Sequence, residues 1–387
     1  MKNSRGVVQN AADALQKAFI KGFSDASLGQ VCVVNLPFVG SYPKGARSLF
    51  FPGCKEMLGT RVHVRGWPFL NLRFVRFLSR FRSAFHGLCV ATRGKKAPFI
   101  VVYSAHLPFL VAARLLKILK PDAVLCIILP DLPEFMGVGG RLYRALKSIE
   151  SILFRYAVQG FSTFVFLTDA MGDRLGVPPA RYVVVEGIYN PIDDLVTEKS
   201  EEPVKSGFII LYTGTLAERY GIVDLLKAFQ MIDLSDAQLW ICGDGDARSR
   251  VEDIASSDSR VFYYGQVTRS QALSLQRKAS VLVNPRRPDG DFTKYSFPSK
   301  TMEYLASGKP VIMHRLPGIP AEYYEHLIVP SSPGVEGLAA SLQDIALRPV
   351  DWITARGKSG RAFVLNCKSP EAQVTRILDL WRAQPRQ

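Results

Sequence analysis

Short apolar runs alternate with amphipathic, helix-like stretches along the chain. The runs are mostly continuous rather than alternating, which is typical of parallel strands covered on both faces. We predict strands at 31–36, 99–103, 123–129, 163–167, 182–185, 208–212, 238–242, 261–264, 280–283 and 310–313. We predict helices at 11–21, 108–119, 140–156, 221–231, 270–278, 299–306 and 370–383. This strand–helix alternation in both halves predicts an α/β fold of doubly wound domains.

One polar segment, 191–206, interrupts the alternation near the middle of the chain. It lacks a hydrophobic period and precedes a clean apolar strand, as an interdomain linker does. We therefore predict one Rossmann-like domain at 1–190 and a second at 207–369. We expect 370–387 to form a C-terminal helix after the second domain, with the option of crossing back to the first.

Positive charge is concentrated in the first half. The chain has 49 Lys and Arg against 34 Asp and Glu, a formal net charge of +15. Between Glu56 and Asp122 there are twelve basic residues and no acidic one. Such a segment attracts an anionic membrane surface, nucleic acid or a phosphorylated ligand. No nucleic-acid-binding motif accompanies it, so we expect no nucleic-acid partner.

Within this basic region, residues 69–86 have the pattern of an amphipathic helix. At about 100° per residue, one face carries six large apolar residues: Leu70, Phe74, Phe77, Leu78, Phe81 and Phe85. Arg73, Arg76 and Arg80 flank this face on one side and Arg82 on the other. An interfacial membrane helix has this composition. A core-facing helix with a basic rim has it too, and both interpretations stay open.

Two further features bear on the cellular location. No apolar stretch reaches the roughly eighteen residues of a membrane span, and the polar N-terminus is not a signal peptide. The spacing of the six cysteines matches neither a metal-ligand motif nor a disulfide pattern. Because Cys32, Cys126 and Cys242 lie in apolar runs, we expect buried free thiols and a reducing cytoplasm.

Two glycine turns follow predicted strands of the second half. The first has Gly214 and Thr215 after strand 208–212, with Arg219 before the next helix, and it presents backbone N–H groups to an anion. The second has Gly243 and Gly245 after strand 238–242, where a ligand can approach the backbone. The first turn by itself is equally explained by ordinary packing, and for the second a plain turn with two glycines is the favoured explanation.

The strongest motif is a basic loop and a helix start after strand 280–283. Its bases are Arg286, Arg287, Lys294 and Lys300, and its candidate N-caps are Ser296 and Ser299, on either side of Pro298. Such a helix start suits a diphosphate. Glu303 can accept two hydroxyls from a ribose diol. The alternative is a solvated helix end with surface lysines.

With these motifs the chain resembles the family 4 glycosyltransferases, in the segments TGTLAERYGI, LWICGDGD and TKYSFPSKTMEYLASGKPVI. The resemblance is good over 208–330, weaker in the first half, and closest to the bacterial exopolysaccharide, capsule and O-antigen branch. It implies the GT-B fold, with two Rossmann-like domains facing a central cleft. It also implies retaining, metal-independent transfer from a nucleotide sugar, a UDP- or GDP-sugar, with no other cofactor.

The resemblance assigns roles in the second half. Glu303 matches the second glutamate of the family's E-x7-E motif and should hold the ribose. Tyr295 stands at the position of the first glutamate, which contacts the donor sugar in many members. The usual basic residues of the first donor loop fall at or near Thr215 and Tyr220. Arg219, Lys294 and Lys300 are then the expected diphosphate-binding cations.

In the first half the resemblance points to candidate catalytic residues. Many members have a histidine after the strand that ends at Leu129, where this chain has Pro130 and Asp131. Asp131 and His106 are therefore candidates beside Glu303, although a histidine such as His106 is more often simply packed. A GT-B chain also opens with a strand before its first glycine loop, whereas only 1–5 precede Gly6 here.

These observations predict a hexosyltransferase. It would transfer a sugar from a nucleotide donor to a hydroxyl of a lipid-linked or polysaccharide-precursor acceptor. We expect a cytoplasmic, peripheral protein on the inner face of the plasma membrane, with 69–86 on the anionic surface. Two alternatives remain: a sugar-nucleotide epimerase of the same architecture and a non-catalytic partner subunit that kept the fold.

Overall fold

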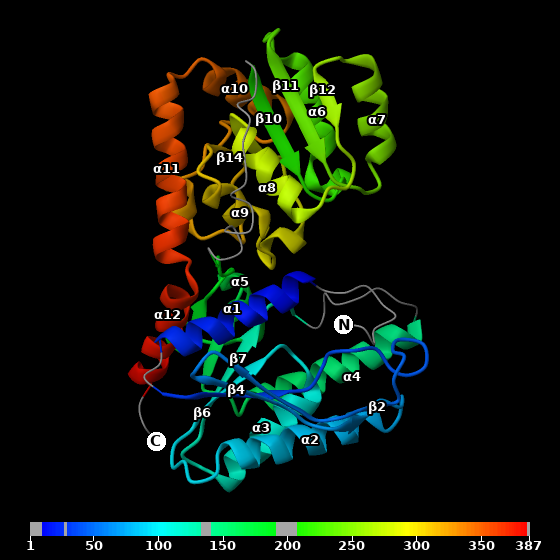
Figure 1. Cartoon of the computed structure of the whole chain (residues 1–387), viewed down its shortest axis with the longest axis vertical. Helices are drawn as coiled ribbons and strands as arrows, with labels where there is room; N and C mark the ends of the chain where they lie inside the picture. Colours follow the sequence, from blue (N-terminus) through cyan, green and yellow to red (C-terminus); the bar gives the residue numbers. More distant parts are fainter. Residues whose placement is uncertain (1–9, 27–28, 133–140, 191–206, 385–387) are drawn as a thin grey trace. The chain divides into compact units, whose positions relative to one another are not determined.

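The computed structural model of the chain describes residues 10–26, 29–132, 141–190 and 207–384 (Figure 1). The chain divides into two compact units, one of Met1–Ile188 with Pro370–Gln387 and the other of Tyr189–Ser369. The predicted linker 191–206 and the start of the chain at 1–5 lie outside the described residues. Each unit is described by itself below.

The described strands of the second unit form one five-stranded parallel sheet in the order β12-β11-β10-β13-β14. The strands are β10 (Phe208–Thr213), β11 (Ala237–Cys242), β12 (Val261–Tyr263), β13 (Val281–Asn284) and β14 (Val311–Met313). The helices are α6 (Ile222–Met231), α7 (Arg248–Ser257), α8 (Arg269–Lys278), α9 (Lys300–Ala306), α10 (Val335–Ala346) and α11 (Val350–Cys367). The five strands and the helices α6, α8 and α9 confirm the sequence predictions to within one residue at each end.

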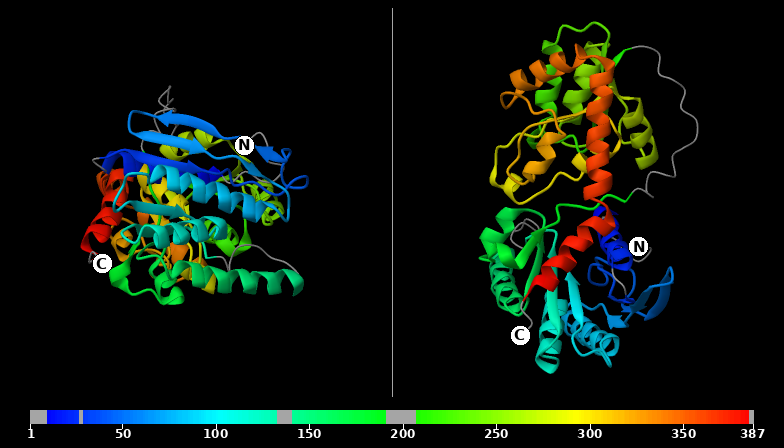
Figure 2. Two further views of the ribbon diagram at one scale, coloured as in Figure 1. Left: turned by 90° about the horizontal axis from the view of Figure 1, so that it is seen from below. Right: turned by 90° about the vertical axis from the view of Figure 1, so that its left-hand side faces the viewer.

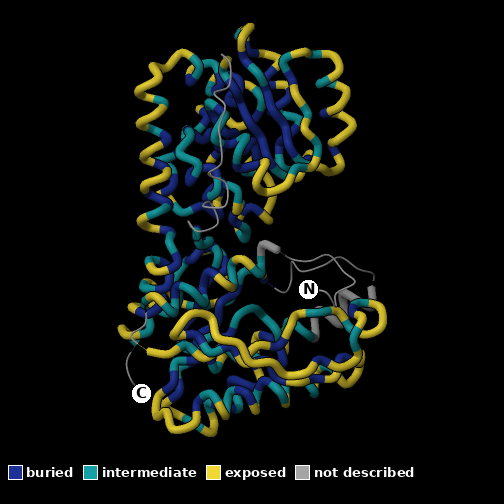
Figure 3. The backbone as a smooth tube through the Cα atoms, in the orientation of Figure 1, coloured by how far each residue is buried: buried dark blue, intermediate teal, exposed yellow. Residues whose placement is uncertain are grey.

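Alternate residues of this sheet pack against α6 and α10. Ile210, Leu239 and Val281 lie in one buried cluster with Phe229 of α6 and Leu342 of α10. Figure 3 shows the central strands of this sheet buried along their length. The strand order reverses between β10 and β13, and ligands of open α/β sheets bind at the carboxyl ends of the strands at such a point.

The first unit has three described sheets. One is parallel, in the order β6-β7-β8-β9; the second has the order β1-β4-β3; the third pairs β2 with β5. The strands are β1 (Val31–Asn35), β2 (Phe50–Phe51), β3 (Cys54–Leu58), β4 (Val62–Gly66), β5 (Phe69–Leu70), β6 (Phe99–Tyr103), β7 (Val124–Leu129), β8 (Thr163–Phe166) and β9 (Tyr182–Val184). The pairs β3–β4 and β2–β5 are antiparallel and were not predicted.

Helices of the first unit include one from the far end of the chain. They are α1 (Asn10–Ala26), α2 (Arg76–Ala91), α3 (Leu107–Leu119), α4 (Arg141–Val158), α5 (Asp169–Leu175) and α12 (Pro370–Ala383). The C-terminal α12 lies beside α1 (Figure 2). Val374 and Ile377 of α12 are fully buried in one cluster with Phe19 of α1 and Cys126 of β7. The last helix is therefore part of the core of the first unit.

The predicted helix over 69–86 is wrong in its first part. Phe69 and Leu70 form β5, which pairs with β2, and the helix begins at Arg76. The apolar face therefore divides in two. Phe81 and Phe85 of α2 stack on each other at 6.1 Å and pack against the buried core of the unit. Phe74, with 88% of its surface exposed, stands outside that core.

Arg80 also departs from the prediction that it lies on a basic rim. It is 2% exposed and donates hydrogen bonds to the backbone oxygens of Leu36, at 3.2 Å, and Pro37, at 2.8 Å. Its guanidinium lies over the ring of Phe69, 4.8 Å from the centroid. The carbonyls that follow β1 need donors once they are buried, and Arg80 supplies them.

The cysteine prediction is confirmed in part. All six cysteines are free, and Cys126 and Cys242 are buried. Cys32 is exposed, because β1 is the edge strand of a small sheet and not a strand covered on both faces.

No helix among the described residues is long and apolar enough to span a membrane.

Candidate functional site

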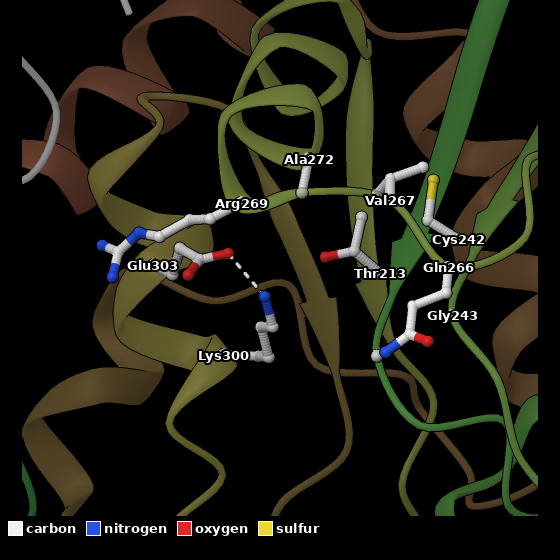
Figure 4. A pocket seen from close by; sticks show the side chains of 10 residues that line it. Thr213, Cys242, Gly243, Gln266, Val267, Arg269, Ala272, Lys300 and Glu303 are labelled. Atoms are coloured by element: carbon white, nitrogen blue, oxygen red, sulfur yellow. Dashed lines mark hydrogen bonds and ion pairs between the residues drawn. The ribbon is translucent and has the colours of Figure 1, made fainter. Parts of the chain in front are cut away.

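A pocket of about 340 Å³ opens at the carboxyl ends of β10 and β11 (Figure 4). These two strands contribute one wall, and α8 with the loop before it and α9 contribute the rest. The lining residues are Thr213, Gly214, Cys242, Gly243, Gln266, Val267, Arg269, Ala272, Lys300 and Glu303. Four of the predicted site residues, Gly214, Gly243, Lys300 and Glu303, therefore lie around one cavity.

Glu303 is held in place by two donors. Its Oε1 accepts hydrogen bonds from Lys300 Nζ and from Gln276 Nε2, both at 2.7 Å. The Glu303 side chain is 17% exposed, and Gln276 is fully buried. No hydrogen bond from a described residue reaches Oε2, so this oxygen is available to a ligand hydroxyl.

The surroundings of Glu303 favour its ionised form. Burial alone opposes ionisation, but the charge of Lys300 and the hydrogen bonds from Lys300 and Gln276 outweigh it, with Arg269 adding to them. The pKa of Glu303 therefore lies below its ordinary value. At neutral pH the pocket presents a fixed carboxylate acceptor, which is what a vicinal diol requires.

A buried tyrosine fixes α9, and with it Glu303, against the sheet. The Tyr304 hydroxyl accepts a hydrogen bond from the backbone N–H of Thr213 at 2.7 Å and donates one to the Thr213 carbonyl at 2.9 Å. The next residue along the helix thus locks Glu303 at the end of β10. Rigid placement of this kind preserves the geometry of a binding carboxylate.

Gly243 and Gly245 allow two loops to touch. A Cβ atom on Gly243, whose φ is +142°, would lie 1.7 Å from the carbonyl oxygen of Gly214, and one on Gly245 would lie 2.4 Å from that of Leu216. Sequence reasoning expected these glycines to admit a ligand. The structure shows that they first admit the neighbouring backbone, which shapes the floor of the pocket.

Gly243→Ala is expected to lower the free energy of unfolding by about 1–3 kcal/mol or more, because the overpacked methyl group must push the Gly214 loop away. Gly265→Ala is the matched control. It also has a positive φ, +66°, but an added Cβ meets no atom within 4 Å. It should cost only the backbone strain, about 1 kcal/mol. Urea denaturation of both variants measures this difference, and equal losses would contradict the steric argument.

The predicted diphosphate-binding residues do not all lie at the pocket. Arg219 is exposed in a 3₁₀ turn, η4 (Glu218–Tyr220), with its guanidinium 4.9 Å from the centroid of the Tyr220 ring. Lys294 pairs with Asp291 at 3.1 Å in η5 (Asp291–Lys294), and its side chain is 51% exposed. Thr215 follows Gly214, and its carbonyl accepts a hydrogen bond from the Tyr212 hydroxyl at 2.7 Å.

Ser296 and Ser299 are not the helix caps that the sequence predicted. Ser299 precedes α9 with helical angles, φ −53° and ψ −27°, whereas a capping serine needs an extended conformation, and its side chain makes no capping bond. The Ser296 hydroxyl instead accepts a hydrogen bond from Arg286 and donates one to the Phe292 carbonyl. Tyr295 ends the η5 turn. The helix α9 spans only seven residues.

The candidates of the first unit, His106 and Asp131, follow the carboxyl ends of β6 and β7. His106 is packed edge-on between Phe38 and Phe109, with ring centroids at 5.8 and 4.7 Å. Its Nε2 is buried and has no hydrogen-bond partner among the described residues. Burial raises the pKa of the Asp131 carboxyl. Between β6 and His106, Ser104 has a φ of +69°, which is rare for a residue with a side chain.

Burial, reinforced by Arg80 and Arg76, lowers the pKa of His106 to about 3. Between that value and 6.5 the unfolded chain binds a proton that the folded chain does not, so acidification through this range should destabilise the first unit. His106→Gln should make stability less dependent on pH across this range. His86→Gln, at an exposed histidine of the same unit, is the control. Urea denaturation at pH 7, 5.5 and 4.5 tests this, and identical slopes for all three proteins would refute it.

Sequence reasoning missed several residues that line the pocket or hold a lining residue in place. Gln276 is the most informative, because Ala272, Leu273 and Gln276 share the buried face of α8. A glutamine at an apolar position of a helix is the signal that a buried polar partner exists, here Glu303. Gln266, Val267 and Arg269 left no such signal, since neither the loop between β12 and α8 nor the start of α8 has a distinctive pattern.

Metal coordination has no evident place in the described residues. No group of three or more His, Cys, Asp or Glu side chains there is arranged to hold a metal ion. Asp244 accepts a hydrogen bond from the backbone N–H of Gly245, and Asp246 accepts one from that of Glu218. Both carboxylates thus stabilise the turn after β11.

Sequence comparison finds a family match within the second unit. Residues 207–347 match the family described as glycosyl transferases group 1. The match spans β10 to the end of α10 and includes every residue that lines the pocket. No curated protein matches the chain. The second unit thus contains a segment that is similar to this family.

Comparison with solved structures extends the similarity to the whole chain. Trehalose-6-phosphate synthase OtsA is 13% identical with a TM-score of 0.63, covering 96% of this chain and 95% of that one. The trehalose 6-phosphate synthase of Burkholderia multivorans is 15% identical with a TM-score of 0.61, covering 98% and 94%. Anabaena Alr3699/HepE, solved in complex with UDP, is 14% identical with a TM-score of 0.53, covering 82% and 86%. These similarities confirm the predicted GT-B fold.

Proposed function

We propose that the protein is a glycosyltransferase that uses a nucleotide-sugar donor. One observation carries the proposal: in the segment that matches the group 1 family, the ionised Glu303 lies in a pocket at the carboxyl edge of a parallel sheet, with Oε2 open to a ligand. A carboxylate so placed suits the hydroxyls of a ribose. The structure of Alr3699/HepE in complex with UDP-glucose, another chain of this fold, supports the choice of donor.

The proposed reaction moves the donor sugar to an acceptor hydroxyl with retention and without a metal ion, as the resemblance to family 4 implies. The bond between the sugar and the diphosphate breaks while the acceptor oxygen bonds to the same carbon. The diphosphate leaves with the bonding electrons and takes the proton of the acceptor. Basic side chains of the second unit stabilise the charge that develops on it. We assign no proton transfer to His106, because its depressed pKa makes it a weak base.

For the acceptor we propose a lipid-linked or polysaccharide-precursor sugar at an anionic membrane surface. The support is an exposed surface on and before α2, the α2 patch, which consists of Leu70, Leu72, Phe74, Val75, Phe77 and Leu78. Arg73 and Arg82 are exposed at its sides. Apolar side chains bordered by arginines match the acyl boundary and the phosphates of an anionic leaflet.

Thermal-shift titration with UDP, GDP and their sugars tests the donor assignment. A ligand at a hundred times its Kd adds about 2.7 kcal/mol of stability. Transfer of labelled sugar to lipid-linked acceptors, with and without EDTA, then tests the reaction and its metal independence. Isomerised nucleotide sugar without transfer would select the epimerase, and nucleotide binding without any turnover would select the non-catalytic subunit.

A further inference from the structure

The two donors that hold Glu303 Oε1 differ in their exposure. Lys300 Nζ, at 2.7 Å, belongs to a side chain that is 40% exposed and lines the pocket. Gln276 Nε2, also at 2.7 Å, belongs to a fully buried side chain on α8 that does not line it. A ligand in the pocket can therefore compete for Lys300, but it cannot reach the amide of Gln276.

A chain of buried polar groups holds this amide in place. Gln276 Nε2 also donates to Thr213 Oγ1, at 3.4 Å, and that oxygen lies 3.2 Å from the Tyr304 hydroxyl. All three side chains are buried. The amide thus links the end of β10 to Glu303 on α9, and its position is set by two elements other than the helix that carries it.

The other end of the amide is unsatisfied. Gln276 Oε1 is buried and accepts no hydrogen bond from any residue that the structure describes. An orphaned buried acceptor destabilises a protein. Turning the amide over would set Oε1 against the carboxylate of Glu303 and leave Nε2 without an acceptor, because both facing atoms would then be acceptors. The amide is therefore oriented for Glu303 and not for its own hydrogen bonding, which packing alone does not explain.

We propose that Gln276 is the positioning residue of the pocket carboxylate. It holds Glu303 ionised and in one orientation, with Oε2 free for a ligand, whether or not Lys300 remains bound to Oε1. A carboxylate on a flexible side chain binds well only if its orientation is fixed in advance. The inference rests on the proposed function, in which Glu303 accepts the ribose hydroxyls of the donor.

The groups around Glu303 allow the proposal to be tested by pH. Its cationic neighbours are Lys300 on α9 and Arg269 on α8, and both favour the carboxylate. Burial raises the pKa of the Cys242 thiol to about 11 and also raises that of the Tyr304 hydroxyl, so both are neutral between pH 5 and 8. In this range a change in the hydrogen bond from α8 therefore acts on the carboxyl group alone.

Gln276→Met keeps most of the side-chain length and removes the donor. The pKa of Glu303 should rise, because a hydrogen bond that favours its ionised form is lost. We expect the affinity for UDP or GDP to fall roughly 10- to 100-fold, the range for a lost hydrogen bond to a charged group. The loss should be larger at pH 5 than at pH 8, because a raised pKa leaves less carboxylate at acidic pH.

Gln276→Glu keeps the shape of glutamine but donates only while it is protonated. Two carboxyl groups in contact cannot both ionise easily, so the pKa of one of them is raised. At pH 5 the protonated side chain should replace the amide as a donor and restore much of the affinity. The loss should then grow toward pH 8. The two substitutions of Gln276 therefore have opposite pH dependences, which a loss of packing would not produce.

Gln373→Met is the matched control. Gln373 is also fully buried and donates to the Gly187 carbonyl at 3.0 Å, but it lies on α12 in the first unit. Its replacement should leave the pKa of Glu303 and the nucleotide affinity unchanged at every pH. Circular dichroism establishes that each variant is folded.

Calorimetric titration of the full chain with UDP and GDP at pH 5, 6.5 and 8 measures the affinities. NMR titration of the carboxyl carbon of Glu303, assigned with Glu303→Gln, measures its pKa without a ligand. An unchanged pKa in Gln276→Met would overturn the proposal, and so would equal losses of affinity at all three pH values in both variants. A raised pKa in a protein that binds no nucleotide would support the positioning role and refute the proposed function.

Discussion

Glu303→Ala is expected to lower the affinity for nucleoside diphosphates by about 1.5–3 kcal/mol, which is tenfold to more than a hundredfold in Kd. The carboxylate is the acceptor that we assign to the ribose hydroxyls, and its removal also leaves Lys300 and Gln276 without their shared partner. Both effects act on the same pocket. Isothermal titration of the variant with UDP and GDP measures the loss, and transfer activity should fall with it.

The control is Glu336→Ala, which removes an exposed glutamate from the first turn of α10 in the same unit. It should leave nucleotide affinity unchanged. Circular dichroism and the melting temperature establish that both variants are folded. A folded Glu303→Ala protein with undiminished affinity would refute the assignment of the ribose site, whatever the result for transfer.

The paired substitution Phe74→Ser and Leu78→Ser is expected to reduce binding to anionic vesicles at least tenfold while leaving the protein folded. These two side chains are 88% and 65% exposed, so they contribute little to the core. Burying a large apolar side chain in the acyl boundary contributes about 1.5–3 kcal/mol. Sedimentation with vesicles of phosphatidylglycerol and phosphatidylcholine measures the loss.

Charge and apolar insertion are separated by salt and by a second pair of variants. Arg73→Ser with Arg82→Ser should remove the salt-sensitive part of binding, because each basic residue near an anionic surface contributes about 1 kcal/mol. Phe262→Ser, at an aromatic residue 40% exposed in the second unit, should leave binding unchanged. Phe81→Ser should instead destabilise the first unit, since Phe81 packs against its core. Equal binding of all variants would exclude the α2 patch as the membrane contact.

The parallel sheets were predictable because their strands carry their own signal. The residues of β7, β10 and β13 are almost all buried, so an unbroken apolar run identifies each of them. The two-residue strands β2 and β5 have no such signal, since they are formed by long-range pairing rather than by their own sequence. For this reason the helix that we expected from Phe69 begins only at Arg76.

For the site, the sequence predicted which residues belong to it better than it predicted which of them contact each other. Glu303 and Lys300 lie together because they are three residues apart on one helix, a spacing that can be read directly. The contact between Arg286 and Tyr220 joins loops 66 positions apart in sequence, and only the close approach of Gly221 to Pro285 brings them together. No local pattern encodes that contact, so it could not be predicted from the sequence.

The return of α12 to the first unit has a consequence for the order of folding during synthesis. Residues 189–369, the second unit, form a continuous insertion that is complete before α12 has been translated. The core of the first unit is not complete then, because Val374, Ile377 and Leu378 fill it from the last helix. On the ribosome the second unit can therefore reach its native state first. The first unit must stay incompletely folded until α12 has been synthesised.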